Sequence, residues 1–355
     1  MDEFVVIKVA HVVGSLKIGG AERFVIDLCE VQKNNDIEPV IISLGQPGED
    51  LERECHQLNT PVFSFKNSLF IKLAKVFSQL RKCNVIHIHT PHALKFIYPL
   101  LPFLSAKCIY TRHGAAPLAA SHWVKLHLKA EKYVDAITFV SQEGADNFQK
   151  THDWKTVQSS VIDNGVLIQS IEKAKPESAV LRVGSVGRMI PLKSQITLLQ
   201  AASLLPLSVQ EKLEIHYFGD GECMSILQDY DEQQHWPVKV FFHGMINDRD
   251  KIYSSFDVLA VTSETEGLSM VIIEAMANRI PVLATNVGGN PKLVIEGETG
   301  HLFDYSDDKT LASLLIAFAE NTQTIKTLGD NAFSYIKDNF SLDTSAKKYA
   351  ELYEK

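Results

Sequence analysis

The sequence has few cysteines and no long apolar run. Its five cysteines are scattered among 355 residues with no Cys-x-x-Cys pair, a pattern that favours reduced thiols in the cytoplasm over a disulfide framework. The longest uncharged apolar run, residues 96–104, is far shorter than the ~20 residues that span a bilayer. Asp2 and Glu3 precede the first apolar segment, the reverse of the charge order in a signal peptide. We therefore expect a cytoplasmic protein that is neither exported nor transmembrane.

Acidic residues are absent from one long interval. No Asp or Glu occurs between Glu54 and Glu131, where ten Lys and Arg residues lie. The first 165 residues hold 18 basic and 17 acidic residues, and the remainder holds 17 and 26. The net charge of −8 is therefore concentrated in the second part of the chain, and one side of the first part is expected to attract anions.

Within this interval, residues 69–82 combine an apolar stripe at helical spacing with Lys72, Lys75, Arg81 and Lys82. A core-facing helix with a solvated basic face is sufficient to explain this pattern. Apolar residues 96–104 and the basic residues around Trp123 add a second candidate surface, and basic and apolar surface together suit peripheral contact with anionic lipid. We expect such contact on the inner face of the cytoplasmic membrane.

Strand-like and helix-like segments alternate along the whole chain, which predicts parallel sheets with right-handed crossovers. The alternation stops in a polar stretch after Asn164-Gly165 and then restarts. The predicted fold class is α/β, with two Rossmann-like doubly wound domains facing across a cleft. The predicted parts are an N-terminal domain, a linker, a C-terminal domain and a final helix that packs back towards the N-terminal domain, at residues 1–168, 169–180, 181–338 and 339–355.

Two turns carry features that suit a phosphate. Gly19-Gly20 lies at a strand-to-helix turn, where adjacent glycines let backbone N–H groups approach an anion, although a plain turn is an equally good explanation of this pair. Arg188 and Lys193 flank the turn after a second predicted strand. Two fixed cations stabilise a diphosphate, particularly when its charge grows as it leaves. Surface cations around a turn are the alternative.

Residues 264–300 are the most informative stretch. Glu266 and Glu274 have seven residues between them, across a glycine turn and a helix. At about 1.5 Å per helical residue they would be roughly 10 Å apart, so we expect them to contact two parts of one extended ligand. Glu266 alone is explained by the dipole of the helix that starts near Ser269. Glu274 alone is explained as a solvated helix residue, but it lies among apolar residues, where an unpaired carboxylate would be costly, and a ligand contact accounts for it.

Histidines are numerous, at 13, and most are expected to be structural. His113 follows a strand within Thr111-Arg112-His113-Gly114, where it suits a sugar hydroxyl. His87 and His89 lie on one face of a strand and resemble part of a zinc site, but no carboxylate or cysteine lies nearby in the sequence to complete one. We predict no metal.

These motifs together resemble retaining glycosyltransferases of the family 4 type, with the GT-B fold, most densely over residues 183–303. The resemblance implies transfer of a hexose or N-acetylhexosamine from a nucleotide diphosphate sugar, UDP-linked, with no cofactor and no metal. The implied acceptor is a saccharide or lipid-linked saccharide of bacterial surface polysaccharide assembly, and no nucleic acid is involved. It assigns catalysis to His113, Arg188, Lys193 and Glu266. The donor-binding residues that it implies are Gly19, Gly20, Arg188, Lys193, Gly219, Met245, Gly267, Leu268, Ser269, Met270 and Glu274.

Two positions depart from the family pattern. Arg279 stands at a turn where glycine is usual, and Lys292 stands where glutamate is usual after Gly288-Gly289. The alternatives on the same architecture are a nucleotide-sugar epimerase, a sugar phosphorylase, and a catalytically silent subunit that only binds a nucleotide or a partner. Donor turnover without acceptor, cleavage that depends on orthophosphate, and binding without turnover would identify these three in turn.

Overall fold

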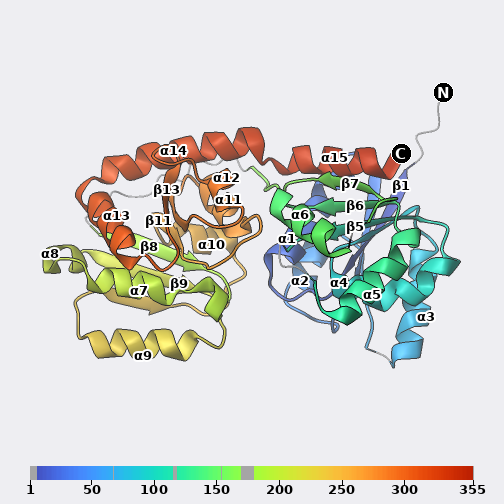
Figure 1. Ribbon diagram of the computed structural model, residues 1–355, viewed down its shortest axis with the longest axis horizontal. Helices are drawn as coiled ribbons and strands as arrows, with labels where there is room; N and C mark the ends of the chain where they lie inside the picture. Colours follow the sequence, from blue (N-terminus) through green and yellow to red (C-terminus); the bar gives the residue numbers. More distant parts are fainter. Residues whose placement is uncertain (1–5, 67, 115–117, 153, 169–179, 355) are drawn as a thin grey trace. The chain divides into compact units, whose positions relative to one another are not determined.

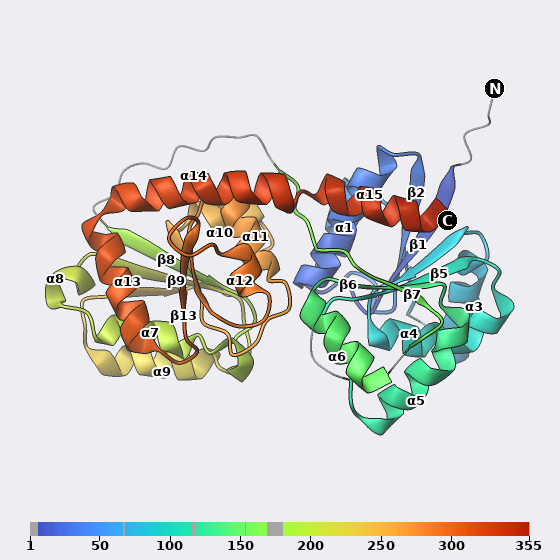
Figure 2. The same cartoon turned by 45° about the horizontal axis from the view of Figure 1, so that its top comes forward.

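The computed structural model describes residues 6–66, 68–114, 118–152, 154–168 and 180–354, shown in Figures 1 and 2. It divides into two compact units, one of residues 1–167 with 341–355 and one of residues 168–340. The predicted linker lies almost entirely outside the described residues, which resume at Val180.

The first unit is built on a seven-stranded parallel sheet in the order β3-β2-β1-β4-β5-β6-β7. Its strands are β1 (Ile7–Val13), β2 (Ile37–Ser43), β3 (Val62–Ser64), β4 (Val85–Ile88), β5 (Lys107–Arg112), β6 (Ala136–Phe139) and β7 (Gln158–Val161). Its helices are α1 (Gly20–Lys33), α2 (Glu52–Gln57), α3 (Leu69–Leu80), α4 (Pro91–Ile97), α5 (Ser121–Ala130), α6 (Gln142–His152) and α15 (Leu342–Glu354), with 3-10 turns η1 (Tyr98–Phe103) and η2 (Glu131–Tyr133).

Strand β1 separates the two core layers of this unit because successive side chains point to opposite faces. Val9 and Val13 pack with residues of α1 and α15, whereas Ala10 and Val12 pack with residues of α3, α4 and α6. Helix α15 lies beside α1, as Figure 2 shows. The last helix of the chain therefore completes the hydrophobic core of the first unit, with Tyr349 fully buried.

The second unit has a six-stranded sheet in the order β10-β9-β8-β11-β12-β13. Its strands are β8 (Leu181–Val186), β9 (Leu213–Phe218), β10 (Lys239–Phe242), β11 (Val258–Val261), β12 (Val282–Thr285) and β13 (Gly300–Phe303). Its helices are α7 (Ile196–Ser203), α8 (Leu207–Gln210), α9 (Met224–Gln234), α10 (Arg249–Ser254), α11 (Met270–Ala277), α12 (Asn290–Leu293), α13 (Asp308–Glu320) and α14 (Thr322–Asn339), with a 3-10 turn η3 (Pro191–Lys193). Residues of α7, α9 and α13 form one core cluster with the sheet.

The predicted α/β class with two parallel, doubly wound sheets is confirmed. The edge strands β3 and β13 have three and four residues, too few to show a reliable period of two in the sequence. No helix among the described residues is both long and apolar enough to cross a bilayer.

Arg279 occupies the left-handed turn that ends α11, with φ of 58°. An ordinary side chain in this conformation costs about 1 kcal/mol or more. The arginine is held by an ion pair from Nη1 to Asp330 Oδ1 at 2.6 Å and by the ring of Phe333, 4.2 Å from its guanidinium carbon. The departure from glycine therefore keeps a left-handed turn and adds a tether to α14.

Arg279→Ala is expected to be less stable than Arg279→Gly by about 1 kcal/mol, because each variant loses the tether but only alanine keeps the left-handed strain. Urea unfolding of the wild type and the two variants measures this difference. An alanine variant at least as stable as the glycine variant would show that the turn is not strained.

Candidate functional site

The loops after β8 and β9 meet backbone to backbone at one edge of the second sheet. Gly187 donates its N–H to Phe218 O at 2.9 Å, and Met189 donates to Asp220 O at 2.9 Å. Gly219 has φ of 135°, and a Cβ there would lie 2.0 Å from Gly187 O. Only glycine permits this approach. Gly219, which is predicted to bind the nucleotide sugar, therefore lies directly against the turn that carries Arg188.

Lys193 and Glu266, predicted separately from the sequence, form one ion pair. Lys193 Nζ lies 2.6 Å from Glu266 Oε1, and Ser263 Oγ donates to the same oxygen at 2.7 Å. Thr262 Oγ1 also donates to Lys193 O at 3.0 Å. The turn after β8 and the loop after β11 are thus joined by charge and by hydrogen bonds. Arg188, on the first of these loops, has an exposed side chain.

The start of α11 is packed against a second glycine turn. Gly289 donates to Gly267 O at 2.9 Å, and a Cβ at Gly289 would lie 2.1 Å from the same oxygen. Leu268, Ser269 and Met270 are buried at the N-terminal end of the helix. The first N–H groups of a helix lack intrahelical partners, so this end suits an anion or a hydroxyl oxygen.

Glu274 is buried, as expected, but its carboxylate has protein partners. Tyr253 OH donates to Oε2 at 2.5 Å, and Arg249 Nε lies 3.7 Å from Oε1. The carboxylate is therefore not unpaired, as the sequence-based argument assumed: one residue of α10 donates a hydrogen bond to it and another places a cation close to it. A role for Glu274 in ribose binding stays a prediction that rests on the family resemblance.

Two further predicted positions lie near these loops. Gly219 donates to Gly244 O at 2.8 Å, and Met245, the next residue, has a half-exposed side chain. Lys292 is exposed on α12 with its ammonium 5.8 Å from the centre of the Phe340 ring. The structure thus places Met245 beside the β9 loop, whereas Lys292 has an aromatic neighbour of its own.

The remaining predicted residues belong to the first unit. Gly19 caps α1 and Gly20 begins it, with Gly19 in an extended conformation that other residues also adopt. His113 follows β5 and is half-buried against Phe24 of α1. Arg188, Lys193, Glu266 and Glu274 belong to the second unit.

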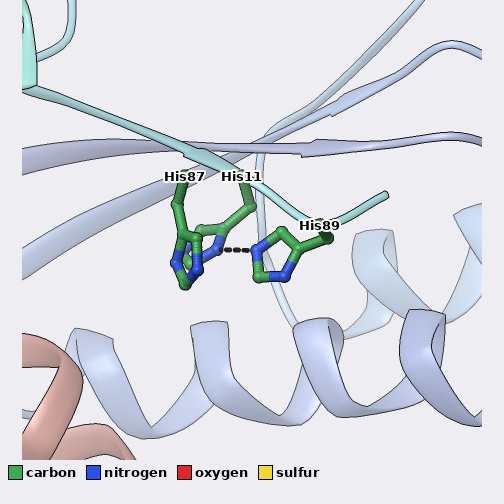
Figure 3. Close-up of side chains that lie close together, drawn as sticks. All are labelled: His11, His87 and His89. Atoms are coloured by element: carbon green, nitrogen blue, oxygen red, sulfur yellow. Dashed lines mark hydrogen bonds between the residues drawn. The ribbon is translucent and has the colours of Figure 1, made fainter. Parts of the chain in front are cut away.

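A cluster of buried histidines is hydrogen-bonded to His113, and the sequence analysis did not predict one of them. His11 of β1 stands beside His87 of β4 in the sheet register, and its Nδ1 lies 2.9 Å from Nε2 of His89 (Figure 3). His89 Nδ1 in turn lies 3.1 Å from His113 Nε2. The sequence signal for His11 is its spacing: it lies two residues from Val9 and two from Val13 in β1, which places all three side chains on one face of the strand.

His11, His87 and His89 bring possible metal-ligand nitrogens within 4.8 Å of one another. Their six ring nitrogens are all engaged already in hydrogen bonds, by His113, Gln32, Thr111, Tyr353 and one another. An ion would have to replace several of these bonds, so the cluster fits a hydrogen-bonded network better than a metal centre.

Burial keeps these rings neutral at physiological pH. Desolvation lowers the pKa of His11 to about 4, against a smaller opposing effect of Gln32, and lowers the pKa of His113 to about 4. It also lowers the pKa of His87 and His89 well below the usual value, with smaller repulsive contributions from neighbouring histidines. Each neutral ring carries one N–H donor and one acceptor nitrogen.

Comparisons with known proteins cover both units. The family model for "Glycosyl transferases group 1" matches residues 169–335, and that for "Glycosyltransferase Family 4" matches residues 18–169. A crystal structure of Anabaena Alr3699/HepE in complex with UDP and glucose superposes with a TM-score of 0.84 and 22% identity, over 98% of this chain and 99% of that one.

Two curated proteins are similar over most of their length. N-acetyl-alpha-D-glucosaminyl L-malate synthase of Bacillus anthracis is 21% identical over 81% of this chain and 78% of its own. UDP-Gal:alpha-D-GlcNAc-diphosphoundecaprenol alpha-1,3-galactosyltransferase of Escherichia coli is 23% identical over 98% and 96%. With two adjoining family models and the same two-sheet architecture, this chain belongs to the GT-B glycosyltransferases of the family 4 type.

Proposed function

We propose that this glycosyltransferase is a retaining enzyme that moves a hexose or N-acetylhexosamine from a UDP-linked sugar to a saccharide hydroxyl. The observation that carries the proposal is the convergence of Arg188, the Lys193–Glu266 pair and the start of α11 at the carboxyl edge of the second sheet. A solved structure of similar fold contains UDP and glucose, and two relatives are named for transfer or attachment of an amino sugar or galactose.

The diphosphate is the group that these charges suit. When the bond between the anomeric carbon and the diphosphate oxygen breaks, negative charge on the leaving group grows, and fixed cations stabilise it most at that point. Arg188 is exposed and directly available, whereas Lys193 is partly compensated by Glu266. We assign diphosphate binding to Arg188 and Lys193, and assign the transferred sugar to Glu266 and the backbone of Gly267 to Met270.

Retention is proposed to proceed by displacement on one face of the sugar. The acceptor hydroxyl forms its bond to the anomeric carbon on the face that the diphosphate leaves, and a diphosphate oxygen takes the hydroxyl proton. No protein nucleophile is then required. Glu266 suits a positioning role because Lys193 and Ser263 hold the carboxylate oxygen Oε1.

The acceptor is proposed to be a lipid-linked saccharide reached at a membrane surface. The first turn of α3 exposes three adjacent apolar side chains, with exposed fractions of 59% for Leu69, 82% for Phe70 and 50% for Ile71. Lys72 follows them, but its Nζ donates to Leu44 O at 2.6 Å, so the apolar residues are the stronger candidates for contact. Exposed apolar groups beside basic residues suit the interface of an anionic bilayer.

Replacing Arg188 with alanine should lower kcat by roughly 100-fold, since a charge-assisted contact that strengthens in the transition state is worth about 3 kcal/mol. Lys193→Ala should lower it at least as much, because it also releases Glu266. The matched control is Lys239→Ala, which removes a cation on β10 whose side chain is 64% exposed. Near-normal turnover in the Arg188 and Lys193 variants would reject the diphosphate assignment.

Activity is expected to be independent of divalent metal, because Arg188, Lys193 and the first N–H groups of α11 are proposed to take the place of a metal ion at the diphosphate. Transfer from UDP-sugar should be equal before and after EDTA treatment. Loss of activity in EDTA that manganese restores would contradict this expectation.

The double variant Phe70→Ser/Ile71→Ser should bind anionic vesicles several-fold more weakly than the wild type, because it removes exposed apolar area from the interface. Leu207→Ser, on α8 and 63% exposed, is the matched control and should bind normally. Sedimentation with phosphatidylglycerol vesicles at low salt measures this. A wild-type protein that stays in the supernatant would indicate a water-soluble acceptor.

A further inference from the structure

His113 is the last residue of a buried chain of hydrogen-bonded side chains. This chain begins on α1 and continues over β1 and the end of β4 to the residue after β5. Gln32 Oε1 lies 2.8 Å from His11 Nε2, His11 Nδ1 lies 2.9 Å from His89 Nε2, and His89 Nδ1 lies 3.1 Å from His113 Nε2. Gln32, His11 and His89 are almost completely buried. Their side chains therefore exchange hydrogen bonds with one another rather than with bulk water.

The amide of Gln32 sets the direction of every bond in this chain. Its Nε2 donates to Tyr353 OH at 3.1 Å, so its Oε1 is the atom that faces His11. An amide oxygen only accepts, so His11 must carry its proton on Nε2. Because the ring is neutral, its Nδ1 is then an acceptor.

The next two rings are constrained in the same way. The bare Nδ1 of His11 requires a proton on Nε2 of His89, which leaves Nδ1 of His89 bare. That nitrogen in turn requires a proton on Nε2 of His113. The Nδ1 of His113 is thereby left as a bare acceptor. This atom is buried and has no hydrogen-bond partner among the described residues.

We infer that Gln32, His11 and His89 are positioning residues that hold His113 in the tautomer with a bare Nδ1, so that the enzyme selects a ligand group that donates a hydrogen bond. A saccharide hydroxyl can donate, whereas an ionised phosphate or a carbonyl oxygen cannot. This inference rests on the proposed function for the identity of the ligand. The donor and acceptor order of the hydrogen bonds from Gln32 to His113 is argued from the ligand-free protein alone.

His87 provides an internal control because it lies on a side branch that leaves Gln32 through Tyr353 and does not lead to His113. Tyr353 OH bonds to His87 Nδ1 at 2.8 Å, His87 Nε2 bonds to Thr111 Oγ1 at 2.6 Å, and Thr111 Oγ1 bonds to Thr138 Oγ1 at 2.6 Å. None of these three bonds involves His113. Thr138→Val removes a buried hydroxyl from this core and leaves the chain from Gln32 to His113 intact.

The first test measures the tautomer of His113 in the free enzyme by two-bond ¹H–¹⁵N spectra of histidine-labelled protein, with the signal assigned by its loss in His113→Asn. We expect a protonated Nε2 and a bare Nδ1 in the wild type and in Thr138→Val. In Gln32→Met, which has no acceptor for His11, we expect a mixture of the two tautomers. Thermal unfolding confirms that each variant is folded.

Three results of this test would overturn the inference. They are a proton on Nδ1 of His113 in the wild type, an unchanged tautomer in Gln32→Met, and a stoichiometric zinc ion bound by the histidines of the purified protein. None of them depends on activity, so they are distinguishable from a failure of the proposed function.

The second test identifies the hydroxyl, with UDP and UDP-glucose as probes. If it belongs to the donor sugar, Gln32→Met should bind UDP-glucose about twofold more weakly than the wild type, because an equal mixture of tautomers leaves half of the sites competent, and should bind UDP equally well. If it belongs to the acceptor, the two affinities should be unchanged and the KM for the acceptor should rise about twofold. Unchanged donor affinity together with an unchanged acceptor KM would overturn the claim of ligand selection.

Discussion

Parallel strands impose the constraint on which the rest of the structure depends. Because each crossover returns the chain to the same edge, every loop that follows a strand emerges at the carboxyl edge of its sheet. In the second unit this gathers the turns after β8, β9, β11 and β12. Residues that are far apart in the chain, such as Lys193 and Glu266, can then pair without any long excursion of the backbone. The chemistry of the site is a consequence of strand direction.

The sequence predicted what depends on local pattern. Alternating apolar and helical segments were enough for the two α/β sheets, and glycine turns marked the loops that meet at their edges. It failed where a contact depends on residues that are distant in the chain. The partners of Glu274 lie on α10, and no local pattern links them to α11. Likewise His11 was not predicted, because only the register of β1 and β4 shows that it lies beside His87.

The two positions that depart from the family pattern, Arg279 and Lys292, differ in how well the structure explains them. Arg279 keeps the left-handed turn and offsets its cost by contacts to α14, so side-chain interactions replace the conformational freedom of glycine. Lys292 lies over Phe340 with its charge exposed. The first is a structural substitution with identifiable partners. For the second, nothing in the structure explains why lysine replaces a carboxylate.

The glycine contacts among the loops of the second unit have a consequence for how a ligand is received. Where backbone touches backbone, as at Gly219 with Gly187 and at Gly289 with Gly267, no side chain can rotate to make room. A displacement of one loop must carry its neighbour with it. The conformational entropy of these loops is therefore lost when the chain folds and not when the ligand arrives. More of the contact energy then remains for affinity, and loop motion contributes little to discrimination between donors.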